Sequence, residues 1–123
     1  MELIGLLSTG KGTWGQIIGL IKRGEWDKII LIGGGYAKKT IFSLNIENIE
    51  KKIEFIEVDL DAPIQDCIEE IKKKLKGRIK GTEVALSIAS GSGKEHMALI
   101  SALINLPVGI KFAVLTKEGV ILL

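Results

Sequence analysis

Two short loops concentrate the residues that could hold an anion. The first loop spans residues 8–13 and the second loop spans residues 90–94, and each precedes a helical pattern. Their members are Ser8, Thr9, Gly10, Lys11, Gly12 and Thr13 in the first loop, and Ser90, Gly91, Ser92, Gly93 and Lys94 in the second. Glycine lets a backbone approach an anion closely, and the first N–H groups of a helix favour negative charge. Both loops therefore predict contacts to a phosphate-bearing ligand, to which the lysines add positive charge.

A plainer interpretation treats both loops as ordinary strand-to-helix turns. Thr13 and Gln16 have the spacing of a capping box, and so do Ser92 and Glu95. A helix cap uses the same hydroxyl and N–H groups without any ligand. For either loop alone the two interpretations stay open, and the position of the loops in the fold is needed to choose between them.

The elements around these loops alternate between strand and helix. Strands are predicted at residues 2–7, 28–32, 53–58, 83–88, 110–115 and 120–122. Helices are predicted at about 13–23, 61–76 and 92–106, with a less defined helical region from about 36 to 51. This alternation predicts one Rossmann-like domain over residues 1–123, a three-layer α/β sandwich with a mostly parallel sheet and a C-terminal β-hairpin.

The commonest strand order for such a unit, 3-2-1-4-5, brings the two loops together. In that order strands 1 and 4 are neighbours where the winding reverses, and ligands bind outside the strand ends at that point. The first and second loops follow those two strands. Gly33 and Gly34, which end strand 2, lie at the same edge and are included among the predicted ligand-binding residues. The topology favours ligand binding over simple turns.

Two nucleotide-binding motifs match only in part. Residues 5–11 begin like a phosphate-binding P-loop, but Gly12 stands where that motif needs a magnesium-binding Ser or Thr. Residues 10–15 match the Gly-x-Gly-x-x-Gly dinucleotide fingerprint after a strand. The acidic residue expected at the end of strand 2 is replaced by glycine at Gly33. A dinucleotide (NAD or FAD) site remains the alternative ligand prediction.

The second loop followed by Met97 resembles a family signature. The run Ser90-Gly91-Ser92-Gly93-Lys94 with Met97 is similar to the Thr-Gly-Gly-Thr-Lys/Arg-x-Met signature of the CRISPR-associated Rossmann fold (CARF) family. One extra residue separates Lys94 from Met97, and serine replaces threonine. The first loop, the compact core and the closing hairpin are also similar to that family.

The resemblance implies a cyclic oligoadenylate sensor in a CRISPR-type antiviral defence system. In that family two copies pair as a homodimer and share one ring, which both loops would contact. Some members cleave the ring with a ribose 2′-hydroxyl and no metal. Here Lys11 and Lys94 would be the catalytic residues, with Ser8 or Ser92 orienting the ligand. No cofactor and no metal are implied. The chain has no Arg followed four to six residues later by His, so no ribonuclease site of the family's effector type is expected, and the protein would be either a stand-alone domain or the partner of a separate effector chain.

Several other side chains have both a functional and a structural interpretation. His96 could act as an acid or base, but a structural role is favoured. Trp14 falls on the apolar stripe of its helix, so it is expected to pack in the core. Tyr36 follows the glycines that end strand 2 and could stack on a base. The buried-thiol pattern around Cys67 predicts core packing and not a nucleophile.

The densest carboxylate group follows strand 3. It comprises Glu57, Asp59 and Asp61, and it is expected to be a solvated loop at the sheet edge. Carboxylates at this spacing could bind magnesium, but the edge position does not favour that interpretation.

Composition excludes some classes of partner and leaves others open. A net charge of +2 does not indicate a duplex DNA partner, and no apolar stretch is long enough to predict a membrane partner. The absence of a basic-then-apolar leader predicts a cytoplasmic location. One cysteine excludes an internal disulfide. The apolar end at residues 120–123 leaves a further alternative, a non-catalytic dimeric subunit.

Overall fold

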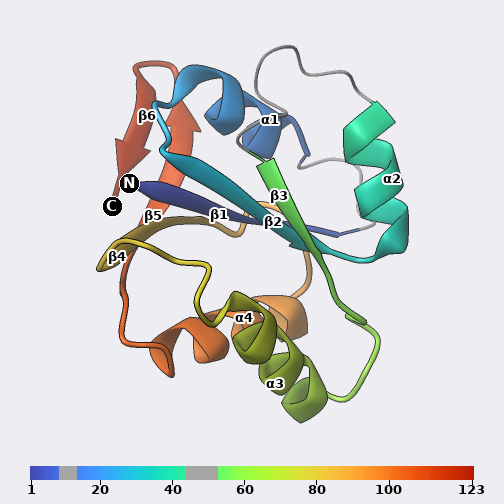
Figure 1. Ribbon diagram of the computed structural model, residues 1–123. Helices are drawn as coiled ribbons and strands as arrows, with labels where there is room; N and C mark the ends of the chain where they lie inside the picture. The colour runs from blue at the N-terminus through green and yellow to red at the C-terminus, as the bar shows by residue number, and fades with distance from the viewer. Residues whose placement is uncertain (9–13, 44–52) are drawn as a thin grey trace.

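A computed structural model describes residues 1–8, 14–43 and 53–123, which form six strands and four helices (Figure 1). The strands are β1 (Glu2–Leu7), β2 (Lys28–Gly33), β3 (Ile53–Glu57), β4 (Glu83–Ser87), β5 (Gly109–Thr116) and β6 (Gly119–Leu122). The helices are α1 (Trp14–Arg23), α2 (Gly35–Ser43), α3 (Ile64–Leu75) and α4 (Gly93–Ile104).

The six strands form one sheet in the order β3-β2-β1-β4-β5-β6. Strands β1 to β5 are parallel, and β6 pairs antiparallel with β5 through a tight turn. Gly119 closes this turn with φ +111°, a conformation that favours glycine. The predicted α/β Rossmann-like class, the order 3-2-1-4-5 and the C-terminal hairpin are confirmed.

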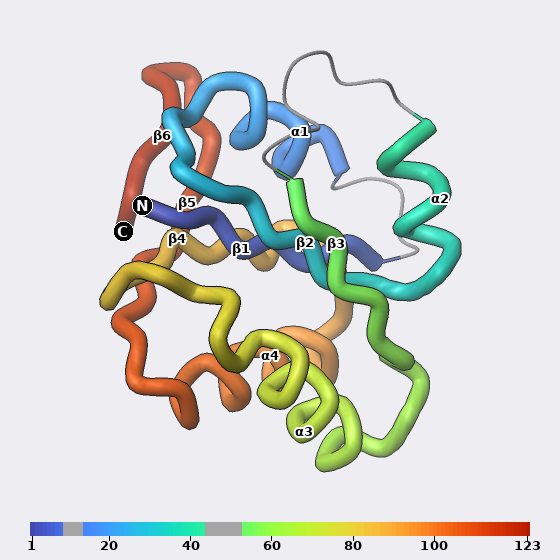
Figure 2. The backbone as a smooth tube through the Cα atoms, viewed as in Figure 1, coloured from blue at the N-terminus to red at the C-terminus, as the bar shows by residue number. Residues whose placement is uncertain are grey.

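Alternating side chains along the strands build two separate apolar cores. On β1, Leu3 and Leu7 pack into the core under α1 and α2, whereas Ile4 and Leu6 pack into the core under α3 and α4. Because both faces are covered, the central strands are apolar on both sides. Figures 1 and 2 show α1 and α2 on one side of the sheet and α3 and α4 on the other, which completes the three layers.

One predicted helix start differs from that in the structure, and a predicted capping box falls partly outside the described residues. Helix α3 begins at Ile64 and not at Asp61, because Pro63 occupies the N-cap with φ −53° and ψ 147° and its ring disfavours helical backbone at Ala62. Gln16, which the sequence pairs with Thr13 in a capping box, bonds through its side chain to the backbone N–H and C=O of Leu115 in β5, both at 3.1 Å. Its partner in that box, Thr13, lies outside the described residues.

The described part of α2 is shorter than the helical region that the sequence predicts. Helix α2 ends at Ser43, and the rest of the helical region predicted up to residue 51 lies outside the described residues. Over the ranges that the structure describes, no helix has the length and apolar character needed to cross a membrane.

Candidate functional site

The ends of β1 and β4 are joined by a direct hydrogen bond. The backbone N–H of Ser8 donates to the Ser90 hydroxyl at 3.0 Å, and the Ser8 hydroxyl donates to the Glu95 carboxylate at 3.3 Å. Ser90 is completely buried. The start of the first loop therefore lies against the second loop, as the strand order predicted. The other predicted first-loop residues, Thr9, Gly10, Lys11, Gly12 and Thr13, lie outside the described residues.

The second loop has a fixed conformation that begins α4. Gly91 has φ +106°, and a Cβ there would lie 2.6 Å from Leu6 Cδ2. The predicted capping box of Ser92 and Glu95 is confirmed: the Ser92 N–H donates to the Glu95 carboxylate at 2.7 Å, and the Glu95 N–H donates to the Ser92 hydroxyl at 3.3 Å. His96 Nε2 lies 2.9 Å from the Ser90 carbonyl, which supports its structural interpretation. The loop's own contacts therefore fix its conformation.

Lys94 extends from α4 to the loop after β3. Its ammonium donates to the carbonyl oxygens of Leu60, at 3.2 Å, and of Ala62. In this structure the Lys94 charge therefore fixes a neighbouring loop. A role beside a phosphate, as the sequence predicts, would use the third N–H of the ammonium or require it to leave one of these carbonyls.

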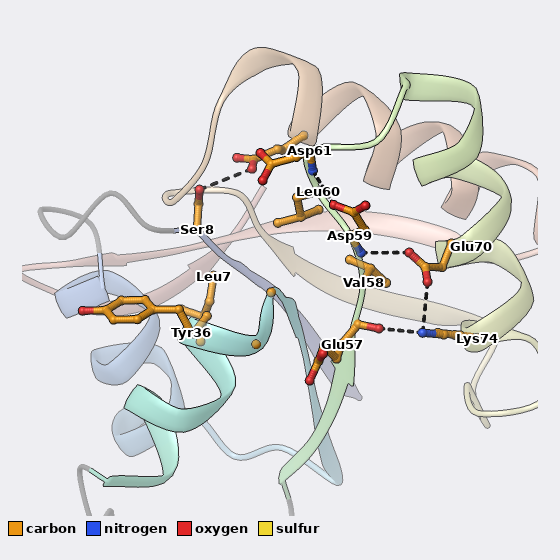
Figure 3. Close-up of a pocket in the computed structure, with 14 residues that line it drawn as sticks. Leu7, Ser8, Tyr36, Glu57, Val58, Asp59, Leu60, Asp61, Glu70 and Lys74 are labelled. Atoms are coloured by element: carbon orange, nitrogen blue, oxygen red, sulfur yellow. Dashed lines mark hydrogen bonds and ion pairs between the residues drawn. The ribbon is translucent and has the colours of Figure 1, made fainter.

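A cavity of about 460 Å³ opens at the carboxyl ends of β1, β2 and β3 (Figure 3). It is lined by Leu7 and Ser8, by residues 34–37 at the start of α2, by residues 57–61 after β3, and by Glu70, Lys74 and Glu95. Gly34 lies in this lining. Gly33 lies beside it, where a Cβ would be 2.5 Å from the Leu7 carbonyl oxygen, so glycine is needed for the close approach of β1 and β2.

The carboxylate segment after β3 is part of this cavity, which the sequence did not indicate. Lys74 donates to the Glu57 carbonyl at 2.7 Å and to the Glu70 carboxylate at 3.1 Å, and the Asp59 N–H donates to Glu70 at 2.9 Å. The Asp59 N–H, and then Lys74, hold the pKa of Glu70 below its ordinary value, against the opposing effect of burial. Glu57, Asp59 and Asp61 are exposed and follow the edge strand β3, in agreement with the expected solvated loop, and contacts from α3 and Lys94 hold this segment in place.

One sequence signal could have located this segment. Strand order places β3 next to β2, so residues after Glu57 must begin near the glycines that end β2. The N–H of Val58 indeed donates to the Gly33 carbonyl at 2.9 Å. The density of carboxylates directly after a parallel strand was therefore a signal that this exposed segment also lines a cavity.

The aromatic and thiol side chains have distinct roles. Trp14 packs into the α1 core as predicted, and its ring N–H donates to the Ser8 carbonyl at 2.8 Å. Tyr36 is 56% exposed and lines the cavity. Cys67 is buried, and burial raises the pKa of its thiol. Its Sγ–H lies 3.3 Å from the Asp59 and Ala62 carbonyls, so the predicted core role is confirmed.

The site offers no obvious metal centre. Within residues 1–8, 14–43 and 53–123, no group of three or more His, Cys, Asp or Glu side chains is arranged to hold a metal ion. The carboxylates of the cavity are spread along residues 57–61, α3 and α4 instead of converging on one point.

Comparisons with known proteins identify a shared fold. No protein-family model matches the chain, and no curated protein matches it. A solved structure, protein VC1899 from Vibrio cholerae, superposes with a TM-score of 0.67 at 15% sequence identity. The match covers 99% of this chain and 33% of that chain, so this chain spans about a third of the length of VC1899. At this identity the likeness concerns the fold alone.

Proposed function

We propose that this protein binds a phosphate-bearing nucleotide at the carboxyl ends of β1 and β4. The main support is the hydrogen bond from the Ser8 N–H to the Ser90 hydroxyl, which joins two glycine- and hydroxyl-rich loops at the point where the winding of the sheet reverses. The N-terminus of the 12-residue helix α4 follows the second loop. Its dipole favours negative charge, and Gly93, where a Cβ would meet nothing within 4 Å, leaves the backbone open to an anion.

The ligand we propose is a cyclic oligoadenylate, bound in the cytoplasm by a homodimer that acts as a sensor in CRISPR-type defence. The resemblance of the second loop and Met97 to the CARF signature supports this choice. Two copies of the chain would contact one ring, each through Ser8 and the residues from Gly91 to Lys94, while Ser90, predicted as a ligand contact, is completely buried and holds Ser8 in place instead. Lys11 and Lys94 would supply positive charge to its phosphates.

A dinucleotide is less well supported. Strand β2 ends at Gly33, so the carboxylate that would hold a ribose at that position is absent from β2. Ring cleavage, with Lys11 and Lys94 stabilising the charged transition state, would use the Lys94 N–H that is not donated to Leu60 or Ala62, or a movement of this ammonium on binding.

The test is calorimetric titration with cyclic tetra-adenylate and cyclic hexa-adenylate, with NAD and ATP as comparison ligands. We expect saturable binding of one ring per two chains. Binding of NAD without either ring would contradict the proposal and favour the dinucleotide alternative. Failure of all four ligands to bind a folded protein would also contradict it.

A matched pair of variants distinguishes binding from a purely structural role. Lys94→Ala is expected to weaken ring binding while leaving the dimer intact, and Lys73→Ala, on the exposed face of α3, is expected to change neither property. Unaltered ring binding by Lys94→Ala would count against the second loop as the site.

A further inference from the structure

A groove lies between the carboxyl ends of α3 and α4, away from the two loops. Figures 1 and 2 show these helices side by side on one face of the sheet. The groove has a volume of about 750 Å³. One wall consists of charged residues between Glu69 and Lys76, and the other consists of Asn105, Leu106 and Pro107. Since α4 has 12 residues, this end lies about 18 Å from the second loop, so the groove is separate from the proposed nucleotide site.

The α3 wall of the groove carries unpaired positive charge. Its two carboxylates are each paired with a lysine of the same helix, at 3.6 and 3.1 Å. By contrast, Lys73 and Lys76 are exposed, and their ammonium groups have no hydrogen-bond or ion-pair partner within the described part of the chain. They are three residues apart and therefore lie on the same side of α3. Positive charge is favoured at this end of a helix, and these two ammonium groups remain able to pair with an anionic partner.

The other wall of the groove is apolar. Leu106 is half-buried and packs against the core under α3 and α4, while Pro107 is exposed. Ile104, the last residue of α4, precedes this wall and is 68% exposed. A side chain that covers this surface is stabilised by the removal of apolar area from water. A phosphate group would pair with the lysines but would gain nothing from this wall.

The carboxyl end of α4 presents hydrogen-bond acceptors. The last carbonyl groups of a helix have no partner inside it. The carbonyls of Ser101 and Leu103 accept from the residues that follow α4. The carbonyls of Ala102 and Ile104 have no such donor within the part of the chain that the structure describes. A peptide backbone carries N–H donors, whereas a phosphodiester backbone carries acceptors, so this end of the helix favours a peptide over a nucleic acid.

We infer that this groove binds an acidic, partly apolar segment of a partner protein. Carboxylates of the segment pair with Lys73 and Lys76, and an apolar side chain between them packs on Leu106 and Pro107. Backbone N–H groups of the segment donate to the free carbonyls at the end of α4. The inference does not depend on the proposed function, because the groove and the nucleotide site share no residue among those that the structure describes.

The test measures fluorescence anisotropy of labelled peptides of about ten residues. In the first peptide, pairs of glutamates alternate with single leucines. Lysine replaces glutamate in the second, and serine replaces leucine in the third. We expect saturable, sub-millimolar binding of the first peptide, weaker binding at higher salt, and no binding of the second. The third is expected to bind about tenfold or more weakly, because it lacks the apolar contact.

Three outcomes of the peptide titrations would overturn the inference. The first is that the glutamate–leucine peptide does not bind the folded protein. The second is that the lysine–leucine peptide binds equally well. The third is that a single-stranded uridine RNA of the same length binds more tightly than the peptide and competes with it, since the groove would then be a nucleic-acid site.

A matched pair of double variants assigns peptide binding to the groove. Lys73→Gln with Lys76→Gln is expected to weaken the glutamate–leucine peptide about fivefold or more, the effect of losing two exposed charge pairs. Lys22→Gln with Lys38→Gln removes two exposed lysines from α1 and α2, on the other side of the sheet, and should retain wild-type affinity. Wild-type peptide affinity in the groove variant would overturn the inference.

The same proteins separate this inference from the proposed function. Both double variants should bind cyclic tetra-adenylate as wild type does, because neither alters a residue of the two loops. Peptide binding without ring binding would overturn the proposed function alone, and ring binding without peptide binding would overturn this inference alone.

Discussion

The backbone N–H of Ser8 donates a hydrogen bond to the hydroxyl of Ser90, and this bond joins the loops that follow β1 and β4. The donor directly follows the first strand and the acceptor is completely buried, so the geometry of the two loops is coupled. The Trp14 ring N–H, bonded to the carbonyl of Ser8, fixes the same residue from the other side. Ser90 is therefore a structural residue of the proposed site as well as a part of its loop.

Replacing Ser90 by alanine tests this coupling. Ser90→Ala removes the acceptor of the Ser8 N–H, and we expect a loss of about 1–2 kcal/mol in the free energy of unfolding, measured by urea titration. Ser101→Ala, a half-buried serine of α4, serves as the control and should change stability by less than about 0.5 kcal/mol. Equal stability of Ser90→Ala and wild type would show that the bond does not support the fold.

Two glycines of the second loop should respond differently to alanine. At Gly91 the backbone has φ +106° and a Cβ would meet Leu6 at 2.6 Å, so Gly91→Ala is expected to cost about 1–3 kcal/mol. At Gly93, the first residue of α4, a Cβ would meet nothing within 4 Å. Gly93→Ala should leave the unfolding free energy within about 1 kcal/mol of wild type or raise it. Similar losses for both variants would contradict this description of the loop.

Lys94 is expected to hold the loop after β3 in place. Removing its ammonium in Lys94→Ala leaves the Leu60 and Ala62 carbonyls without this donor. We expect amide hydrogen exchange of Asp59, Asp61 and Ala62 to accelerate about tenfold, as for the loss of one charge-assisted bond. Lys73→Ala is the control for a lost lysine charge. Unchanged exchange in Lys94→Ala would mean that other contacts suffice to hold the loop.

Glu70 predicts a specific dependence of stability on pH. Its pKa is lower in the folded protein than its ordinary value of 4.5, so its contribution to stability is present above that value and is lost as the pH falls through the folded pKa. Glu70→Gln should therefore be less stable than wild type near neutral pH, and the difference should shrink as the pH falls below about 4.5. Urea unfolding at several pH values measures this difference.

The control for this pH dependence is Glu69→Gln. Glu69 is more exposed than Glu70, and its ion pair with Lys72 is longer, at 3.6 Å. An exposed pair of this kind contributes little to stability. A constant difference between Glu70→Gln and wild type at all pH values would contradict the assigned role of Glu70.

The sequence predicts the fold well because the relevant signals are local and periodic. The alternation of Leu3 and Leu7 with Ile4 and Leu6 reports two covered faces, and the alternation of strands with helices reports a parallel sheet. Strand order then followed from a topological rule, and it correctly placed Ser8 beside Ser90. The second capping box was also predicted, since Ser92 and Glu95 are three residues apart.

The sequence predicts the site less well because the decisive contacts join distant segments. Gln16 has the spacing of a cap, but the backbone of Leu115, far along the chain, offers it two hydrogen bonds. Lys94 has the position of a phosphate ligand, but two carbonyls after β3 lie within its reach. The segment from Glu57 to Asp61 lines the cavity because two residues of α3 bond its backbone: Lys74 donates to the Glu57 carbonyl, and Glu70 accepts from the Asp59 N–H. Spacing along the chain does not report such contacts.

The most direct test of the central claim is to locate the ligand on the protein. Amide chemical shifts are recorded by NMR while cyclic tetra-adenylate is added to the labelled protein. The account predicts the largest changes at Ser8, at residues 90–94 and at residues 34–36. Little change is expected at Glu2, Lys80 and Gly81, which lie near the amino ends of β1 and β4. Changes concentrated at those amino ends, or no changes at a saturating concentration of the ring, would contradict a nucleotide site at the carboxyl ends of β1 and β4.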